Sequence, residues 1–159
     1  MATNGERAYE LLQAKVGEAE GTGEWFEVTQ DLINLFADAT HDHQWIHVNP
    51  KQAEEMSPWK ATIAHGFLTL SLLTHLTGSI GRDPAPYEGI VMGINYGFDK
   101  VRFVTPVKVG SRVRASSTLA DVTLRDPNTV QAKRAITVEI DGEAKPALAA
   151  EWLTVMSYS

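Results

Sequence analysis

Residues 63–80, IAHGFLTLSLLTHLTGSI, give the clearest indication of how this chain folds. It contains no Asp, Glu, Lys or Arg, and its apolar residues from Phe67 onward fall on more than one face of a helix. A helix that is apolar nearly all round is usually buried in a core. Gly78 and Gly81 supply stop signals. We therefore predict a buried helix over Phe67–Ile80. The interspersed histidines and glycines argue against a membrane span.

After this helix, apolar residues recur at every second position of the sequence. Alternation of apolar and polar residues indicates strands with one buried face. The predicted strands are Ile90–Tyr96, Lys100–Val104, Val113–Leu119, Ile136–Ile140 and Leu148–Val155. Asp126-Pro127-Asn128 and Asp141-Gly142 are typical of hairpin turns. The second half of the chain is therefore predicted to form an antiparallel sheet.

The sequence before the central helix favours shorter helices. The predicted elements are a helix over Arg7–Val16, a strand over Glu24–Val28, a helix capped by Thr29 and running through Asp38, and a helix starting at Asn49-Pro50. The fold class is therefore α+β, with an antiparallel sheet wrapped around one long central helix.

Length and composition set the remaining limits. The chain has 159 residues, which predicts a single domain over 1–159. It has no cysteine, which excludes a disulfide scaffold, a cysteine zinc site and a thiol nucleophile. Its formal net charge is −6 with no basic cluster, which argues against nucleic-acid binding. The N-terminal residues lack a signal-peptide pattern, so we expect a cytoplasmic protein.

Three of the five histidines fall within His41–His47, and a fourth, His65, precedes the central helix. We expect the first segment to be a loop between helices. Its groups have three interpretations: solvated loop residues, a metal site, or acid–base chemistry by Asp42 and His47. The metal interpretation is the weakest, because His41-x-His43 is not followed by the glutamate and glycine of cupin motifs.

His65-Gly66 also has two interpretations. The pair can cap the helix, with glycine allowing tight packing. Alternatively, the free N–H groups and positive dipole end of the helix can stabilise a carbonyl that becomes an oxyanion, and glycine lets that carbonyl approach the backbone.

Two motifs in order carry a resemblance to a known family. They are Asp42-x-x-x-x-His47-x-Asn49-Pro50 and Ile63-Ala64-His65-Gly66-Phe67-Leu68, supported by Phe36-Ala37-x-x-Thr40 and by the segment Tyr96–Gly110. Over residues 29–155 the chain resembles the MaoC-like, (R)-specific enoyl-CoA hydratase family. That family usually places Asn-Pro between the aspartate and the histidine, whereas here it follows His47. This variant is similar to the NodN-like branch.

The resemblance implies a hotdog fold, a homodimer formed by edge pairing of sheets, and an acyl-CoA or acyl carrier protein thioester bound in a tunnel. It implies reversible syn addition of water to a trans-2-enoyl thioester, giving a (3R)-hydroxyacyl product. Asp42 and His47 would be catalytic. Gly66 and Phe67 N–H groups, with His65 beside them, would bind the thioester oxygen. Coenzyme A would be part of the substrate, and no separate cofactor or metal is expected.

Other polar residues are weaker candidates. Ser71 and Thr74 either line the acyl channel or bond back to helix carbonyls. Asn49 is expected chiefly as a helix cap, with substrate contact as the alternative. Candidate partners for the coenzyme A phosphates are Lys100, Arg102 and Arg82.

Two other functions stay open. A hotdog thioesterase commonly carries a carboxylate on the central helix, and none lies between Gly66 and Ile80. A non-catalytic acyl-thioester-binding module would retain the fold without turnover.

Overall fold

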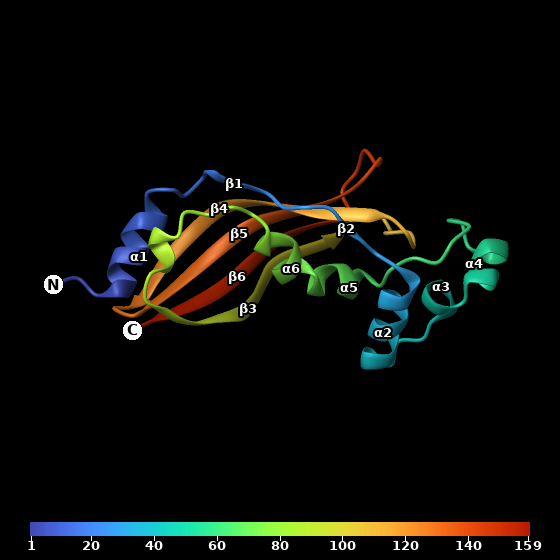
Figure 1. Cartoon of the computed structure of the whole chain (residues 1–159), viewed down its shortest axis with the longest axis horizontal. Coiled ribbons are helices and arrows are strands. Elements are labelled where there is room, and N and C mark those ends of the chain that lie inside the picture. The colour runs from blue at the N-terminus through green and yellow to red at the C-terminus, as the bar shows by residue number, and fades with distance from the viewer.

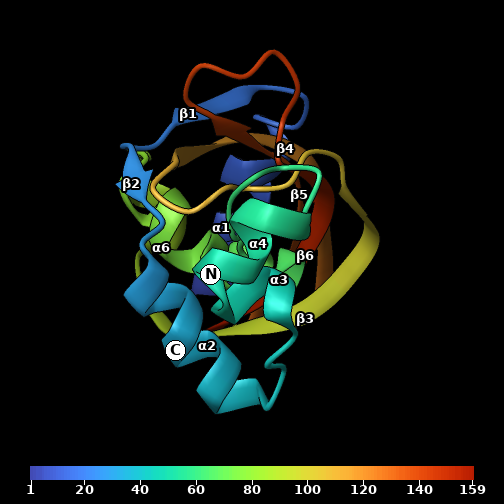
Figure 2. The same cartoon turned by 90° about the vertical axis from the view of Figure 1, so that its right-hand side faces the viewer.

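A computed structural model describes all residues 1–159 as an α+β structure built on one antiparallel sheet. The strands lie in the order β1-β4-β5-β6-β3, and β2 pairs with β4 beside this path. Their bounds are β1 Ala19–Thr22, β2 Phe26–Glu27, β3 Ile90–Phe103, β4 Arg112–Asp126, β5 Thr129–Ile140 and β6 Leu148–Tyr158. The sheet curls around a helix that runs inside its concave face (Figures 1 and 2).

The helical elements lie at both ends of the sheet and within its curve (Figure 1). Their bounds are α1 Asn4–Gln13, α2 Gln30–Thr40, α3 Trp45–Val48, α4 Pro50–Met56, α5 Gly66–Ser71, α6 Leu73–Gly78 and the short 3₁₀ helix η1 Ala85–Tyr87. Helices α2, α3 and α4 gather at one end, and α1 and η1 lie at the other. None of the helices combines the length and apolarity needed to cross a bilayer.

The predicted central helix is present but shorter and less buried than expected. It begins at Gly66 and ends at Gly78, and an irregular turn at Leu72 divides it into α5 and α6. Leu72 N–H still donates to Leu68, and Leu76 N–H donates to Leu72, so the two pieces continue each other. Leu68, Leu73 and Leu76 pack into the main core against the sheet.

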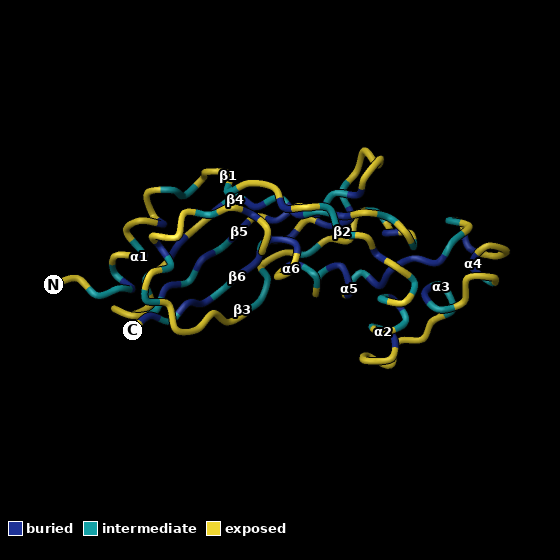
Figure 3. The backbone as a smooth tube through the Cα atoms, in the orientation of Figure 1, coloured by how far each residue is buried: buried dark blue, intermediate teal, exposed yellow.

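The expectation of an all-round buried helix was wrong for a single chain. Phe67 is 67% exposed, and Ser71, Thr74 and His75 are exposed as well. The sheet covers only one side of the helix, so the other side faces outward (Figure 3).

Strands β4 and β5 show the predicted alternation of buried and less buried residues, whereas β3 contains no buried residue. Strands β3 to β6 are longer than predicted, and β2, at Phe26–Glu27, is shorter than the predicted Glu24–Val28. The two predicted pieces before Pro106 form one strand, β3, because register shifts at Asn95/Gly97 and Phe98/Lys100 absorb the break in alternation. Asp126 to Thr129 makes the predicted tight turn between β4 and β5. Strand β1 was not predicted, because its sequence AEGT carries no alternating signal.

Capping residues explain where the first helices begin. Thr3 and Glu6 form a capping box, so α1 starts at Asn4 rather than at the predicted Arg7. Thr29 caps α2 by accepting from Leu32 N–H, as predicted. Asn49 caps α4 in the same way, with Pro50 at its first position.

Candidate active site

The His41–His47 segment is half loop and half helix, so the prediction of a loop was only partly right. His41 ends α2 in the left-handed region, at φ 62°. Asp42 follows in an exposed loop, and its Oδ1 accepts weakly from Gln44 N–H at 3.4 Å. His47 lies on the short helix α3 and is 7% exposed. The segment therefore joins a solvated carboxylate to a buried imidazole.

The orientation of His47 is set by the backbone just before the central helix. Its Nδ1 donates to the carbonyl oxygen of Ile63 at 2.7 Å, because a carbonyl can only accept. This leaves Nε2 as the nitrogen available for a ligand. Burial lowers the pKa of the His47 imidazole, and the neighbouring His65 lowers it further, against the raising effect of the hydrogen bond to Ile63. His47 is therefore biased toward its neutral form.

His65 connects the two halves of the site. It is 3% exposed, and its ring stacks on that of His47 with centroids 3.8 Å apart. Its Nε2 donates to the backbone carbonyl of Asp42 at 2.9 Å and lies 4.0 Å from the Asp42 carboxylate. His65 occupies the N-cap position of α5, but its side chain makes no capping hydrogen bond to the helix. Instead it holds the Asp42 loop against His47.

Asp42, His47 and His65 each offer an atom within 4.8 Å of the others. This proximity suits a shared water molecule as well as a metal ion. The two imidazole planes, however, lie only 23° apart in a stack, so their in-plane nitrogen lone pairs run alongside each other. A metal needs such lone pairs to converge on one point about 2.1 Å away. The arrangement fits acid–base chemistry better than metal binding.

A cavity of about 270 Å³ opens beside this cluster. It is lined by His47, Gly66, Thr69, Phe103 and neighbouring residues of the segments around them. His47 and Gly66 therefore line the same cavity. A Cβ at Gly66 would lie 2.9 Å from the Phe103 ring, so only glycine fits without movement there.

The first amides of α5 are available to a ligand. Leu68 and Thr69 are the first residues to donate within the helix, both to the carbonyl of His65. The N–H groups of Gly66 and Phe67 therefore have no intrahelical partner. The Phe67 side chain itself points out of the chain, edge-on to Phe103 at 5.6 Å.

Thr69 is a pocket residue that sequence reasoning missed. It is 3% exposed and lines the cavity one turn after Gly66. The signal was present in the sequence, since Thr69 is a hydroxyl residue three positions after Gly66, one helical turn further along the helix.

The other predicted polar residues are spread along the helix. Ser71 Oγ donates to the carbonyl of Phe67 at 2.7 Å, which is the back-bonded alternative. Ser71 and Thr74 also line a separate cavity with Leu70, Leu73 and Asn95. Asn49 caps α4 and does not line the cavity beside His47.

The three predicted phosphate partners do not lie together. Lys100 and Arg102 are exposed on β3, and Arg102 donates to the carbonyl of Val101 at 2.9 Å. Arg82 follows the far end of α6 and pairs with Glu20 at 3.2 Å. Within the chain, Arg82 is therefore at the opposite end of the central helix from His47.

Comparisons with known proteins bear on this site. The family model described as "MaoC like domain" matches residues 12–140. The chain is 47% identical to "Nodulation protein N" of Rhizobium meliloti (strain 1021) over 93% of this chain and 90% of that protein. It is 51% identical to "3-hydroxyacyl-thioester dehydratase Z" of Mycobacterium tuberculosis (strain ATCC 25618 / H37Rv), over 88% of this chain and 89% of that protein.

Solved structures show the same fold. The (R)-hydratase from A. caviae, described as involved in PHA biosynthesis, superposes with a TM-score of 0.67 at 23% identity. The match covers 87% of this chain and 94% of that one. At this identity the likeness concerns the arrangement of sheet and helix.

Proposed function

This chain belongs to the MaoC-like domain family and has its hotdog fold, and on that premise we propose that it is an (R)-specific enoyl-thioester hydratase and dehydratase. The proposal depends chiefly on one observation. A carboxylate oxygen of Asp42 and a ring nitrogen of the buried His47 lie within 4.8 Å of each other, and His47 lines a cavity together with Gly66 at the start of a helix. The relative named a 3-hydroxyacyl-thioester dehydratase supports the reaction class.

The chemistry begins with a water molecule between the two side chains. Groups up to 4.8 Å apart can both bond one water at about 2.8 Å. Asp42 takes a proton from this water, and the oxygen of the water bonds to C3 of the trans-2-enoyl thioester. The electrons of the double bond move onto the thioester oxygen and form an enolate. His47 orients the water through Nε2 and relays the proton.

The enolate is the species that the helix end would stabilise. Backbone N–H groups aimed at a developing oxyanion contribute strongly in a water-poor site. Gly66 N–H, with Phe67 N–H, would bond the thioester oxygen. The proton then returns from the Asp42–His47 pair to C2 on the same face, which completes syn addition and gives the (3R)-hydroxyacyl thioester. The reverse sequence is the dehydration.

Two further aspects of the function are proposals. Strand β3 ends the sheet, and its outer edge has no partner within the chain. Apolar side chains are exposed along it, including Val91, Ile94 and Tyr96. Such an edge is usually paired or covered, so we assign it to a homodimer formed by pairing of two β3 strands.

Lys100 and Arg102 on the same strand remain proposed partners of the coenzyme A phosphates.

The decisive experiment replaces each catalytic residue and measures hydration of crotonyl-CoA. D42N and H47Q should each lower turnover by about two to four orders of magnitude, the usual size of an acid–base contribution. D38N is the matched control, because Asp38 forms an exposed pair with His43 at 2.9 Å in the same part of the chain. It should leave turnover unchanged.

The assay should follow loss of the enoyl absorbance together with release of free thiol. Thiol release without loss of the enoyl group would identify a thioesterase and contradict the proposal. Binding of the enoyl thioester with no turnover at all would identify a binding module. Near-normal hydration by a folded D42N or H47Q variant would contradict the assignment of these residues.

A further inference from the structure

Three of the cavities are lined by successive parts of the central helix and by residues of β3. The first contains Gly66 and His47, the second lies at Leu70 to Thr74, and the third lies at Thr74 to Gly78. The second and third share Thr74, Asn95 and Trp152. The first cavity shares no lining residue with the other two. From Gly66 to Gly78 the helix rises about 18 Å. These cavities along the central helix give an acyl chain starting at the candidate active site a direction to follow.

The third cavity, of about 280 Å³, has an unusual charge. Its lining includes Arg82 and Arg134 and contains no acidic residue. The rest of its lining is uncharged, and Asn95 and Thr154 are among its polar members. A cavity in which a hydrocarbon chain simply ended would be expected to be apolar, since covering an arginine with hydrocarbon removes its hydration. The presence of two arginines in the lining therefore indicates a role other than contact with hydrocarbon.

Arg134 is held rigidly in this wall. It rises from β5, and its side chain is 6% exposed. It donates to Glu20 at 2.8 Å, to the Tyr87 hydroxyl at 3.0 Å and to the Thr154 hydroxyl at 3.3 Å. Burial by itself would raise the pKa of the Glu20 carboxyl, but Arg134, Ser117 and Arg82 hold it below its ordinary value. Glu20 is thus a fixed negative charge behind the cavity.

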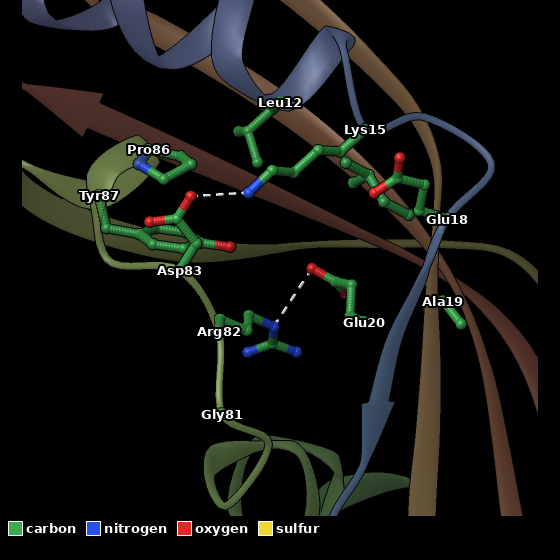
Figure 4. Close-up of a pocket in the computed structure, with 11 residues that line it drawn as sticks. Leu12, Lys15, Glu18, Ala19, Glu20, Gly81, Arg82, Asp83, Pro86 and Tyr87 are labelled. Carbon is green, nitrogen blue, oxygen red and sulfur yellow. Dashed lines mark hydrogen bonds and ion pairs between the residues drawn. The ribbon is translucent and has the colours of Figure 1, made fainter.

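The Glu20 carboxylate pairs with only part of the Arg82 guanidinium. Its Nε lies 3.2 Å from Glu20, and its terminal nitrogens point away from that carboxylate (Figure 4). They make no hydrogen bond within the chain, and the side chain is 24% exposed. The nearby Asp83 pairs with Lys15 at 2.7 Å. Glu20 is therefore the one acidic side chain paired with both arginines. Arg82 lines the third cavity and also borders a neighbouring cavity that Lys15, Glu18, Glu20 and Asp83 line.

We propose that this third cavity is a carboxylate-binding subsite, and that its occupant is the far end of the substrate's acyl chain. The favoured substrates would then be enoyl thioesters whose chains end in a carboxylate. The guanidinium of Arg82 would bind this group through two parallel N–H bonds, the geometry in which arginine and carboxylate match. Arg134 would add its charge from behind. The identity of the thioester rests on the proposed function, whereas the carboxylate site rests on the cavity alone.

The test uses pairs of trans-2-enoyl-CoA substrates of equal length, ending in a methyl group or a carboxylate, over a series of increasing length. At the length that reaches Arg82, kcat/KM for the carboxylate form should exceed that for the methyl form by about tenfold or more. R82Q should reduce this ratio by a similar factor, and R82K should retain part of it. R114Q is the control, because Arg114 pairs with Glu139 and covers Trp25 outside this cavity. It should leave the ratio unchanged.

Hydration of methyl-ended substrates with no preference for a carboxylate at any length would overturn the subsite and leave the proposed function intact. If neither series is hydrated, the proposed function fails, and calorimetric binding of a saturated carboxylate-ended acyl-CoA decides the subsite. Tighter binding than that of its methyl-ended counterpart, lost in R82Q, supports the subsite, and equal binding overturns it. Adipate binding that is lost in R82Q, without any substrate preference, would overturn the assignment to the acyl chain.

Discussion

At the scale of single residues, the candidate site depends on which ring nitrogen of each of two histidines makes a hydrogen bond to the backbone. His47 uses Nδ1 to bond the Ile63 carbonyl, which leaves Nε2 for its proposed role in the reaction. His65 uses Nε2 to bond the Asp42 carbonyl and stacks on His47. A protonated His65 would repel a protonated His47 across 3.8 Å. The pair therefore favours a neutral His47, which can accept a hydrogen bond from the attacking water.

This arrangement predicts the pH dependence of the reaction. Burial and His65 place the pKa of His47 below the ordinary value of 6.5. Since the proposed hydration needs the neutral imidazole, kcat/KM for crotonyl-CoA should stay constant as pH falls through 6.5 and decline only at lower pH. A pH–rate profile measures this. A decline centred above 6.5 would contradict it.

The same shift predicts how stability depends on pH. The unfolded chain binds a proton at His47 at a higher pH than the folded chain does, so protonation favours unfolding. Above about pH 6.5, His47 is neutral in both states and has no effect on the free energy of unfolding. As pH falls from there toward the pKa of His47 in the folded chain, protonation of His47 in the unfolded chain lowers the free energy of unfolding. Urea unfolding across this range should show that slope, and H47Q should reduce it. An unchanged slope in H47Q would contradict the burial argument.

At the scale of elements, close backbone contacts position the central helix against the sheet. Gly23, between β1 and β2, lies against α6, where an added Cβ would overlap the Leu76 carbonyl oxygen and approach Ser79 Oγ at 2.7 Å. The Leu76 backbone cannot move without disturbing the core residues beside it. Gly23 therefore acts as a spacer between the first strands and the helix.

G23A should lower the free energy of unfolding by about 1–3 kcal/mol, the usual cost of overpacking. G78A is the matched control, because a Cβ at Gly78, the last residue of α6, would meet nothing within 4 Å. Alanine also favours helix over glycine, so G78A should raise stability by about 0.5–1 kcal/mol. Chemical denaturation of both variants measures the difference. Equal effects at the two glycines would contradict the contact at Gly23.

At the scale of the whole molecule, the sheet leaves one long edge uncovered. Strand β3 exposes Val91 at 67% and Tyr96 at 56%, and the outward side of the central helix exposes Phe67. A single chain with these surfaces would be prone to edge-to-edge association. Pairing of two β3 strands would cover the edge in a closed, symmetric dimer.

The native mass should therefore be twice the chain mass of 17.5 kDa. The double variant V91K/I94K should shift the protein toward monomer, because charges on an edge strand oppose pairing. L35K is the control, since Leu35 is equally exposed, at 66%, but lies on α2. Sedimentation equilibrium measures all three proteins. A dimer that persists in the double variant would place the interface elsewhere.

Local pattern predicted much of the fold. The alternation of Val113 to Leu119, the caps at Thr29 and Asn49, and the apolar run after Gly66 each act over a few residues, so the sequence alone could identify their elements. The residues at which helices and strands begin and end were less predictable. Thr3 moved the start of α1, and register shifts in β3 joined two predicted strands into one, because pairing with β6 outweighs local breaks in alternation.

The central helix, the alternating strands and the Asp42, His47 and Gly66 motifs can be identified from the sequence, because each depends on residues close together in the chain. The stacking of His65 on His47 is visible only in the folded structure. The folded structure alone joins Arg134 to Glu20, which is 114 residues away, and places Arg82 beside them. These contacts follow from how the sheet curls around the helix. No local pattern records that curvature, because it arises from packing across the whole molecule.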